Sequence, residues 1–200
     1  MSWHLVLLSF VLIFPVELPD KTFVASLVLA TRYPPLAVWI GVGLAFCAQC
    51  VVAVTAGSLV SLFPHQIVEG LSTAMFVIGA IVLVRSAPNA AQDEEDAEHE
   101  FEDRTATRAT GIRAAAASFL LIFAAEWGDL SQILTLNLVA KQGHPVSVFV
   151  GSWAALLAVS ALAVLAGRML LRRLRLDVLH YVAAAVCVAF AVVGAVQLAQ

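Results

Sequence analysis

Long apolar stretches make up most of the chain, and short turns and one polar segment separate them. A transmembrane helix needs about 20 mainly apolar residues. We predict six such spans, at residues 4–30, 35–61, 66–85, 112–140, 146–170 and 178–199. The apolar runs are continuous and do not alternate with polar residues, so the pattern favours helices over a β-barrel.

The composition supports a membrane protein and excludes several other classes. Hydrophobic residues make up 62% of the 200 residues, and charged residues only 12%, against about 25% charged residues in ordinary soluble domains. The mean hydropathy is +0.94. The net charge of −3 offers no basic surface to a nucleic acid. The span ends carry no nucleophile–base pair or histidine-rich metal site, so we expect no enzyme and no cofactor, with the lipid bilayer as a partner.

An acidic pair occurs once in each half of the chain, and a hydroxyl residue follows it each time. The two sets are Glu17, Asp20 and Thr22, then Glu126, Asp129 and Ser131. Each half holds three predicted spans, which is an odd number, so the second half enters the membrane from the opposite side. We therefore predict an all-α membrane protein with six transmembrane helices, arranged as two inverted three-helix repeats.

The predicted organisation has three parts. Residues 1–86 form the first repeat, residues 87–110 an acidic linker, and residues 111–200 the second repeat. Eight of the eleven residues from Asp93 to Asp103 are acidic, which is typical of a solvated, disordered segment. A segment that collects or senses metal is the alternative interpretation.

The arginines indicate the orientation of the chain in the membrane. Lys141 lies on one predicted side, while the other side collects Arg32, Arg85, Arg104, Arg108, Arg113, Arg168, Arg172, Arg173 and Arg175. Because positive residues concentrate on the cytoplasmic side, we predict a cytoplasmic linker and both termini outside. The preference for arginine over lysine, with much alanine and valine, is compatible with a GC-rich bacterial source. We therefore expect an integral protein of the bacterial inner membrane.

Five ionisable side chains fall at membrane depth, namely Glu17, Asp20, Lys21, Glu126 and Asp129. A charge at the centre of a span costs about 2.5–3.5 kcal/mol on insertion scales. Residues at i and i+3 share one face of a helix, so four carboxylates converge if the two repeats face each other. Protons or a divalent cation with a preference for oxygen ligands can neutralise this surplus. A site that holds one or the other indicates an exchanger.

Neutral oxygens near the two motifs are candidates to complete the coordination. They belong to Thr22, Ser26, Gln49, Ser131, Gln132 and Thr135. Ser26 and Thr135 have the alternative of bonding to their own helices, Gln49 that of a bond between helices, and Lys21 that of a structural counter-ion. Pro15, Pro19 and Gly128 are expected to interrupt the spans and free backbone carbonyls near the site.

The doubled motif resembles the hallmark E-φ-G-D-[KR]-[ST] of a cation/proton exchanger family. That family includes eukaryotic Golgi manganese/calcium exchangers and bacterial manganese exporters. The copies here are Glu17-Leu18-Pro19-Asp20-Lys21-Thr22 and Glu126-Trp127-Gly128-Asp129-Leu130-Ser131. Pro19 replaces the glycine of the first copy, and Leu130 replaces the basic residue of the second. The resemblance implies that the carboxylates and hydroxyls of both copies bind the cation.

The resemblance also implies the exchange of a divalent cation for protons, with Mn²⁺ favoured and Ca²⁺ as the second candidate. In a bacterial plasma membrane, inward proton flow would drive the metal out of the cytoplasm. The alternatives are a passive divalent-cation channel and an exporter of small organic cations or amino acids. Small residues on the second and fifth spans permit close helix packing, either within one chain or in a homo-oligomer.

Overall fold

The regular elements of the computed structural model are all helices in the part of the chain that it describes, which is residues 1–200 without 19, 105–108, 172–175 and 199–200. The elements are α1 (Trp3–Glu17), α2 (Lys21–Arg32), α3 (Pro35–Val60), α4 (His65–Ser86), the 3₁₀ helix η1 (Ala87–Asn89), α5 (Ala90–Arg104), α6 (Ile112–Ala125), α7 (Leu130–Gln142), α8 (Pro145–Leu171) and α9 (Leu176–Leu198).

Four of these helices, α3, α4, α8 and α9, contain apolar stretches long enough to cross a membrane. The pairs α1–α2 and α6–α7 each qualify as one further span, but they bend by 74° and 72° at a short break. The prediction of an all-helical membrane protein is therefore confirmed, with four to six spans. Each bent pair occupies one predicted span, so the first and fourth predicted spans are not continuous helices.

Local sequence explains where the helices begin and end. Pro35 and Pro145 are the first residues of α3 and α8. Proline is well tolerated at this position, because the first N–H groups of a helix have no hydrogen-bond partner within the helix. Gly143 ends α7 in a left-handed conformation with φ +64°, which glycine adopts without a side-chain clash. Pro15 lies inside α1, and the break after this helix comes at Glu17 instead. Pro19 lies outside the described residues.

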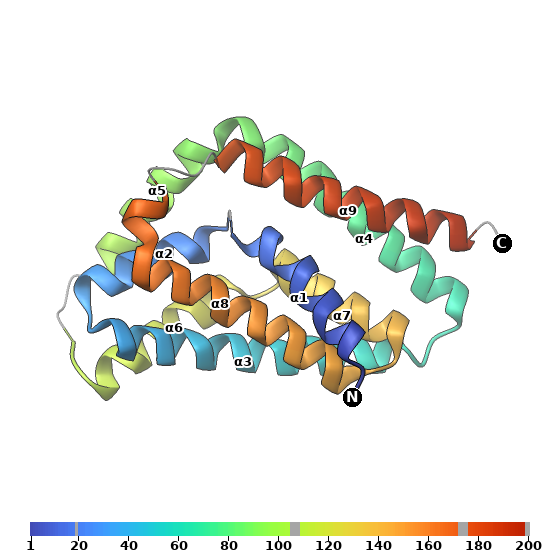
Figure 1. Cartoon of the computed structure of the whole chain (residues 1–200), viewed down its shortest axis with the longest axis horizontal. Helices are drawn as coiled ribbons and strands as arrows, with labels where there is room; N and C mark the ends of the chain where they lie inside the picture. The colour runs from blue at the N-terminus through green and yellow to red at the C-terminus, as the bar shows by residue number, and fades with distance from the viewer. Residues whose placement is uncertain (19, 105–108, 172–175, 199–200) are drawn as a thin grey trace.

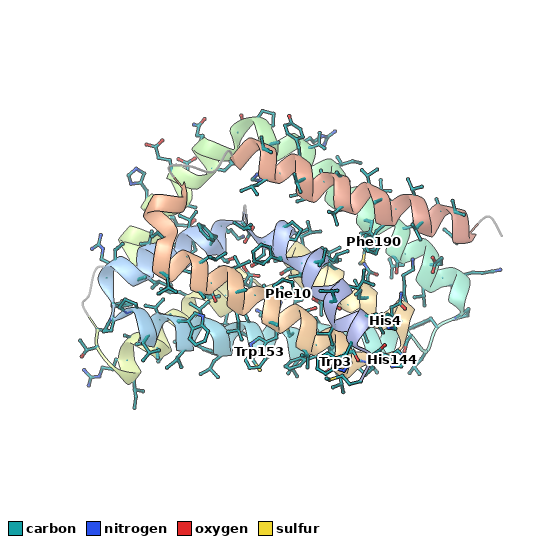
Figure 2. The ribbon with its side chains drawn as sticks, in the orientation of Figure 1. Trp3, His4, Phe10, His144, Trp153 and Phe190 are labelled. Atoms are coloured by element: carbon teal, nitrogen blue, oxygen red, sulfur yellow. The ribbon has the colours of Figure 1, made fainter. Side chains whose placement is uncertain are left out.

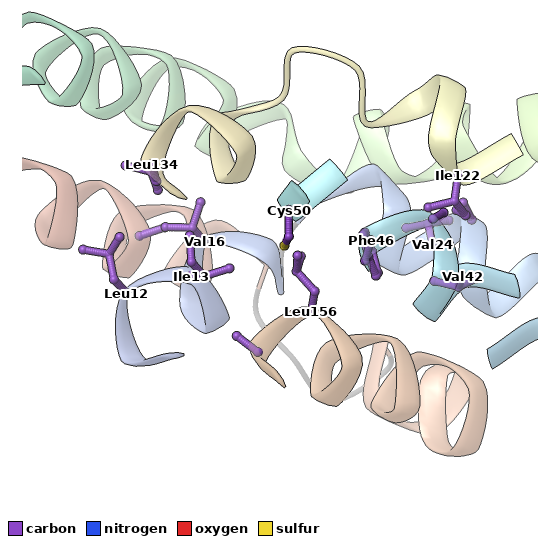
Figure 3. Close-up of a cluster of buried hydrophobic side chains, with 14 of the residues drawn as sticks. Leu12, Ile13, Val16, Val24, Val42, Phe46, Cys50, Ile122, Leu134 and Leu156 are labelled. Carbon is purple, nitrogen blue, oxygen red and sulfur yellow. The ribbon is translucent and has the colours of Figure 1, made fainter. Parts of the chain in front are cut away.

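The helices form a bundle and an arm. In the bundle, α1 packs on α8, and α3 packs on α6, α7 and α8. Helices α4 and α9 pack mainly against each other, and we call this pair the arm; Figure 1 shows it along one side of the molecule. Figure 3 shows the apolar core of the bundle, where side chains of six helices meet: Leu12, Ile13, Val16, Val24, Val42, Phe46, Cys50, Ile122, Leu134 and Leu156.

Two glycines allow the closest approaches in the bundle. A Cβ at Gly41 of α3 would collide with the backbone oxygen of Ala115 on α6, and a Cβ at Gly151 of α8 would collide with that of Val6 on α1. Small residues let membrane helices approach until their backbones touch. Both contacts support the helices that carry the acidic motifs.

The acidic linker is folded where it is described, so the expectation of a disordered segment is wrong there. Residues 90–104 form helix α5, which packs against α2. Ala90, Ala97 and Phe101 are buried on its inner face. Ala97 and Phe101 are four residues apart and therefore lie on one side of a helix, so two apolar residues among the acids are enough to dock it. The arginines 108, 172, 173 and 175 lie outside the described residues.

Candidate functional site

The two acidic motifs form the breaks between α1 and α2 and between α6 and α7. In the first break, the backbone N–H of Asp20 donates to the carbonyl of Glu17 at 3.1 Å. The Asp20 carboxylate then accepts the N–H of Thr22 at 3.2 Å and caps α2. Aspartate is a favourable N-cap because its oxygen satisfies an otherwise unpaired N–H.

The second break repeats this hydrogen bonding. The N–H of Asp129 donates to the carbonyl of Glu126 at 3.2 Å, and the Asp129 carboxylate accepts the N–H of Ser131 at 3.2 Å. Between the two acids, Gly128 has φ +81°, which explains the glycine at this position of the motif. Each motif therefore ends one helix with a glutamate and begins the next with an aspartate.

Three of the four motif carboxylates meet in one group. Glu17, Asp20 and Glu126 each place one carboxylate oxygen within 4.8 Å of the other two. Glu17 is 1% exposed and Glu126 2%, so both glutamates lie inside the bundle. Asp129 falls outside this group of three, while it caps α7 at its edge. The sequence could indicate that the four acids converge, but not which one would lie to the side.

The hydroxyl of the first motif lies between two carboxylates. The Thr22 hydroxyl is 3.0 Å from an oxygen of Glu17 and 3.1 Å from one of Asp20, and it donates to this pair. One oxygen of Glu17 and one of Glu126 are buried without a hydrogen-bond partner in the described structure.

Of the additional candidates, Ser26 is the one with a free hydroxyl. It is buried, and its oxygen has no hydrogen-bond partner among the described residues. The Thr135 hydroxyl donates to the Ser131 carbonyl at 2.8 Å and lies 3.2 Å from that of Ser152. Thr135 therefore donates a hydrogen bond to its own helix, which is the alternative to a ligand role that the sequence analysis considers for it.

Hydrogen bonds of two glutamines connect the second break to α3. The Gln49 amide donates to the Phe123 carbonyl at 2.8 Å, and its oxygen accepts from Gln132 at 2.6 Å. The oxygen of Gln132 accepts the backbone N–H of Gly128 at 2.9 Å. This chain connects α3, the end of α6 and the turn, so Gln49 makes the interhelical bond that was one of its two predicted roles.

A cavity of about 230 Å³ leads to the acidic group from the end where the linker lies. Asp20 and Asp129 line its inner part, and Lys21, which is exposed, also lines it. Ser86 of α4, Asp93 of α5 and His180 of α9 are the other polar residues of the lining. The sequence gives no sign that Asp93 or His180 lies near the first break, because no motif connects a linker helix and the sixth span to it.

The arrangement concentrates negative charge where water is largely excluded. Buried carboxylates need a cation, protons or hydrogen-bond donors to compensate for lost hydration. Thr22 and Ser131 supply donors, but the two unpartnered oxygens leave capacity for more. Carboxylate and hydroxyl oxygens suit Ca²⁺, Mg²⁺ and Mn²⁺, so the group has the chemistry to hold one such ion or, in its place, protons.

The fold and the site thus define a helical membrane protein with an acidic centre at two helix breaks. A family model described as "divalent cation/proton antiporter GDT1" matches residues 5–91 and 114–200. The chain belongs to this family, which confirms the resemblance seen in the motifs.

Three similar proteins come from a cyanobacterium and two plants. A GDT1-like protein of Synechocystis sp. is 33% identical over 62% of this chain and 65% of its own length. GDT1-like protein 1, chloroplastic, of Oryza sativa subsp. japonica is 27% identical over 95% of this chain and 61% of its own. Protein PAM71, chloroplastic, of Arabidopsis thaliana is 30% identical over 95% and 56%. The chain therefore spans less than two thirds of the length of each of these three relatives. No solved structure matches it.

Proposed function

We propose that this protein is a secondary transporter that exchanges a divalent metal cation for protons. The observation that carries the proposal is the buried group of Glu17, Asp20 and Glu126, whose oxygens lie within 4.8 Å of one another. Two of the buried glutamate oxygens have no hydrogen-bond partner among the described residues. The family to which the chain belongs supports the same activity.

The proposed ligands are the carboxylates and hydroxyls of both motifs, namely Glu17, Asp20, Thr22, Glu126, Asp129 and Ser131. Glu17, Asp20 and Glu126 bind the ion directly, while Asp129 receives it from the linker-side cavity that it lines. The Thr22 hydroxyl holds Glu17 and Asp20 in place, the backbone N–H of Ser131 holds Asp129, and both residues offer their hydroxyl oxygens to the ion. Ser26 is an additional ligand because its buried hydroxyl is unpartnered in the described structure.

Mn²⁺ is the proposed substrate and Ca²⁺ the second candidate. Both ions accept carboxylate and hydroxyl oxygens, and a site without sulfur or imidazole ligands does not favour softer metals. Leu130 takes the place of a basic residue in the second motif, which leaves the centre more negative than the motif of the family would. A more negative site binds a divalent ion more strongly.

The proposed cycle uses the two halves as inverted repeats around the central site. Matching hydrogen bonds at both breaks support this symmetry. With the linker in the cytoplasm of a bacterial cell, the described cavity opens inward. Cytosolic metal enters it and displaces protons from the carboxylates, and external protons then displace the metal on the other side.

Transport by purified protein in proteoliposomes tests this proposal. Mn²⁺ and then Ca²⁺ are added outside in the presence of a proton gradient, and internal pH and internal metal are followed together. We expect proton movement that requires metal and stops in Glu126→Gln. Metal entry without linked proton flux would contradict exchange and favour a channel. Proton flux driven by small organic cations or amino acids, and not by metal, would contradict the substrate class.

A further inference from the structure

A second cavity, of about 240 Å³, lies at the end of the molecule away from the linker. Its lining comes from α1, α4, α7 and α9, through Leu8, Glu69, Asn137, Lys141 and Phe190 among others. Figure 2 places Phe190 on the part of the arm that faces the bundle. Both cavities therefore lie between the arm and the bundle, one at each end of the arm.

The two cavities differ in what they reach. Asp20 and Asp129 line the linker-side cavity, whereas the far cavity is lined by no motif carboxylate among the described residues. Phe76 and Leu138 form part of its wall and are 1% and 4% exposed. The rings of Phe76 and Phe190 stack with centroids 5.2 Å apart. The far cavity is therefore lined partly by buried apolar side chains and does not reach the motif carboxylates, whereas the linker-side cavity reaches two of them.

An ion pair fastens the arm to the bundle at this end. Lys141 Nζ of α7 lies 2.7 Å from a carboxylate oxygen of Glu69 on α4. The Glu69 side chain is 3% exposed and that of Lys141 15%. Next to the pair, the Ser72 hydroxyl of α4 donates to the Asn137 side-chain oxygen of α7 at 2.8 Å. These polar contacts all bridge the same two helices, one in the arm and one in the bundle.

The packing inside the arm brings α9 into the same region. A Cβ at Gly194 of α9 would collide with the hydroxyl of Thr73 on α4 and would come 3.5 Å from Lys141 Nζ. Glycine therefore lets α9 lie directly over the ion pair. Helices α4 and α9 therefore form one packed unit beside the ion pair.

We propose that Glu69 and Lys141 form the gate that closes the transport site on the side away from the linker. The arm is the element that this gate holds. When the site opens to the far side, the arm moves away from α7, the ion pair separates, and both charges become hydrated in the enlarged cavity. An ion pair suits this role because breaking it inside the protein is costly, whereas separated charges in water are stable.

The reverse movement closes the gate and opens the linker-side cavity. Asp20 and Asp129 then face that cavity again. The role as a gate rests on the proposed function, but its geometry can be tested without transport, because each cavity offers a position for a reporter cysteine.

The experiment measures how fast a membrane-impermeant maleimide labels single cysteines in nanodiscs without metal. The parent has Cys47, Cys50 and Cys187 replaced by alanine. One reporter, Leu8→Cys, lines the far cavity on α1, and the other, Ser86→Cys, lines the linker-side cavity. Each reporter is combined with Glu69→Gln, with Lys141→Met, and with the charge-swapped pair Glu69→Lys with Lys141→Glu.

We expect both single variants to label faster at the far reporter and slower at the linker-side reporter. Both rates should return toward those of the parent in the charge-swapped pair. Arg113→Gln is the control, since it removes an exposed charge from α6 at a residue that lines neither cavity, and it should change neither rate. If a neutral variant does not fold, Glu69→Asp is used in its place, because the shorter side chain lengthens the ion pair without removing either charge.

Two results would overturn the proposal. If the far reporter labels faster while the linker-side reporter is unchanged, the pair only stabilises local packing. If neither rate changes in folded variants, the pair does not hold the arm. If the two reporters change in opposite directions as expected, but the protein transports neither Mn²⁺ nor Ca²⁺, the gate is supported and the proposed substrate is contradicted.

Discussion

At the scale of single residues, Glu17 and Glu126 are the most deeply buried acids of the proposed site. Each is the last acid before a helix break and each is almost fully buried. Two buried glutamates that each keep an oxygen without a partner in the described structure are costly in a membrane protein. Their cost is explained if the missing partner is the transported ion.

Replacing Glu126 with glutamine is predicted to abolish exchange and leave the fold intact. The amide has nearly the shape of the carboxylate but lacks its charge, so a ligand is lost while the packing stays. Proteoliposome exchange and the melting temperature of the metal-free protein are the measurements. Glu95→Gln is the control, because it removes an exposed acid from α5. Exchange that persists in Glu126→Gln would remove this residue from the site.

Thr22 is predicted to position two carboxylates at once. Thr22→Val keeps the shape and removes the hydroxyl that donates to Glu17 and Asp20. We expect metal affinity to fall by about 10–100-fold, as is common when a partner of a metal ligand is lost. Thr22→Ser, which keeps the hydroxyl, should retain affinity. Equal affinities of the two variants, measured by calorimetry, would show that the hydroxyl is unimportant.

The sequence singles out the four motif carboxylates for a physical reason. Charged side chains at membrane depth are rare and expensive, so Glu17, Asp20, Glu126 and Asp129 stand out from an apolar background. The partners of Gln49 are different, because its bonds to Phe123 and Gln132 join positions far apart in the chain. Nothing in the local pattern separates such an interhelical bond from a metal ligand.

At the scale of helices, the breaks and the close contacts matter most. The sequence predicts six apolar spans, and the described helices agree with their positions within a few residues. It does not predict that α1–α2 and α6–α7 bend by more than 70°. A proline or glycine indicates where the helical hydrogen bonds are weak, but it does not indicate the angle between the two helices. The capping bonds of Asp20 and Asp129 give each new helix its start.

The contact between α8 and α1 is predicted to be sensitive to a single methyl group. Gly151→Ala places a Cβ against the backbone of Val6, and overpacking of this kind costs about 1–3 kcal/mol. Gly70→Ala in α4 is the matched control, since its Cβ would meet nothing within 4 Å. Alanine forms helices better than glycine by about 1 kcal/mol. Thermal unfolding should therefore show a lower midpoint for Gly151→Ala and an equal or higher one for Gly70→Ala.

Helix α5 is the element whose structure the local composition predicts wrongly. Counting acids predicts a solvated segment, but Ala97 and Phe101 occur at a helical spacing and dock on α2. The docking surface on α2 is a tertiary feature that composition cannot report. As a result, Asp93 lies at the cavity that leads to the site.

At the scale of the whole molecule, the bundle holds the acidic group and the arm covers it. Cavities lie at both ends of the arm, and one of them is lined by motif carboxylates. The internal repeat of the sequence predicts a central site, whereas the difference between the two ends depends on how α4 and α9 pack against the bundle. The sequence gives no direct signal for that packing.

In the proposed transport cycle, metal and protons compete for the same carboxylates. Carboxylates must lose their protons to bind a metal, so binding releases protons and affinity rises with pH. Calorimetric titration of the purified protein with Mn²⁺, in buffers of different ionisation enthalpy, counts the protons released per ion. We predict one ion bound, proton release that decreases as the pH rises, and no binding in Glu17→Gln with Glu126→Gln. Mn²⁺ binding that releases no protons at any pH, or that survives in this double variant, would contradict the account.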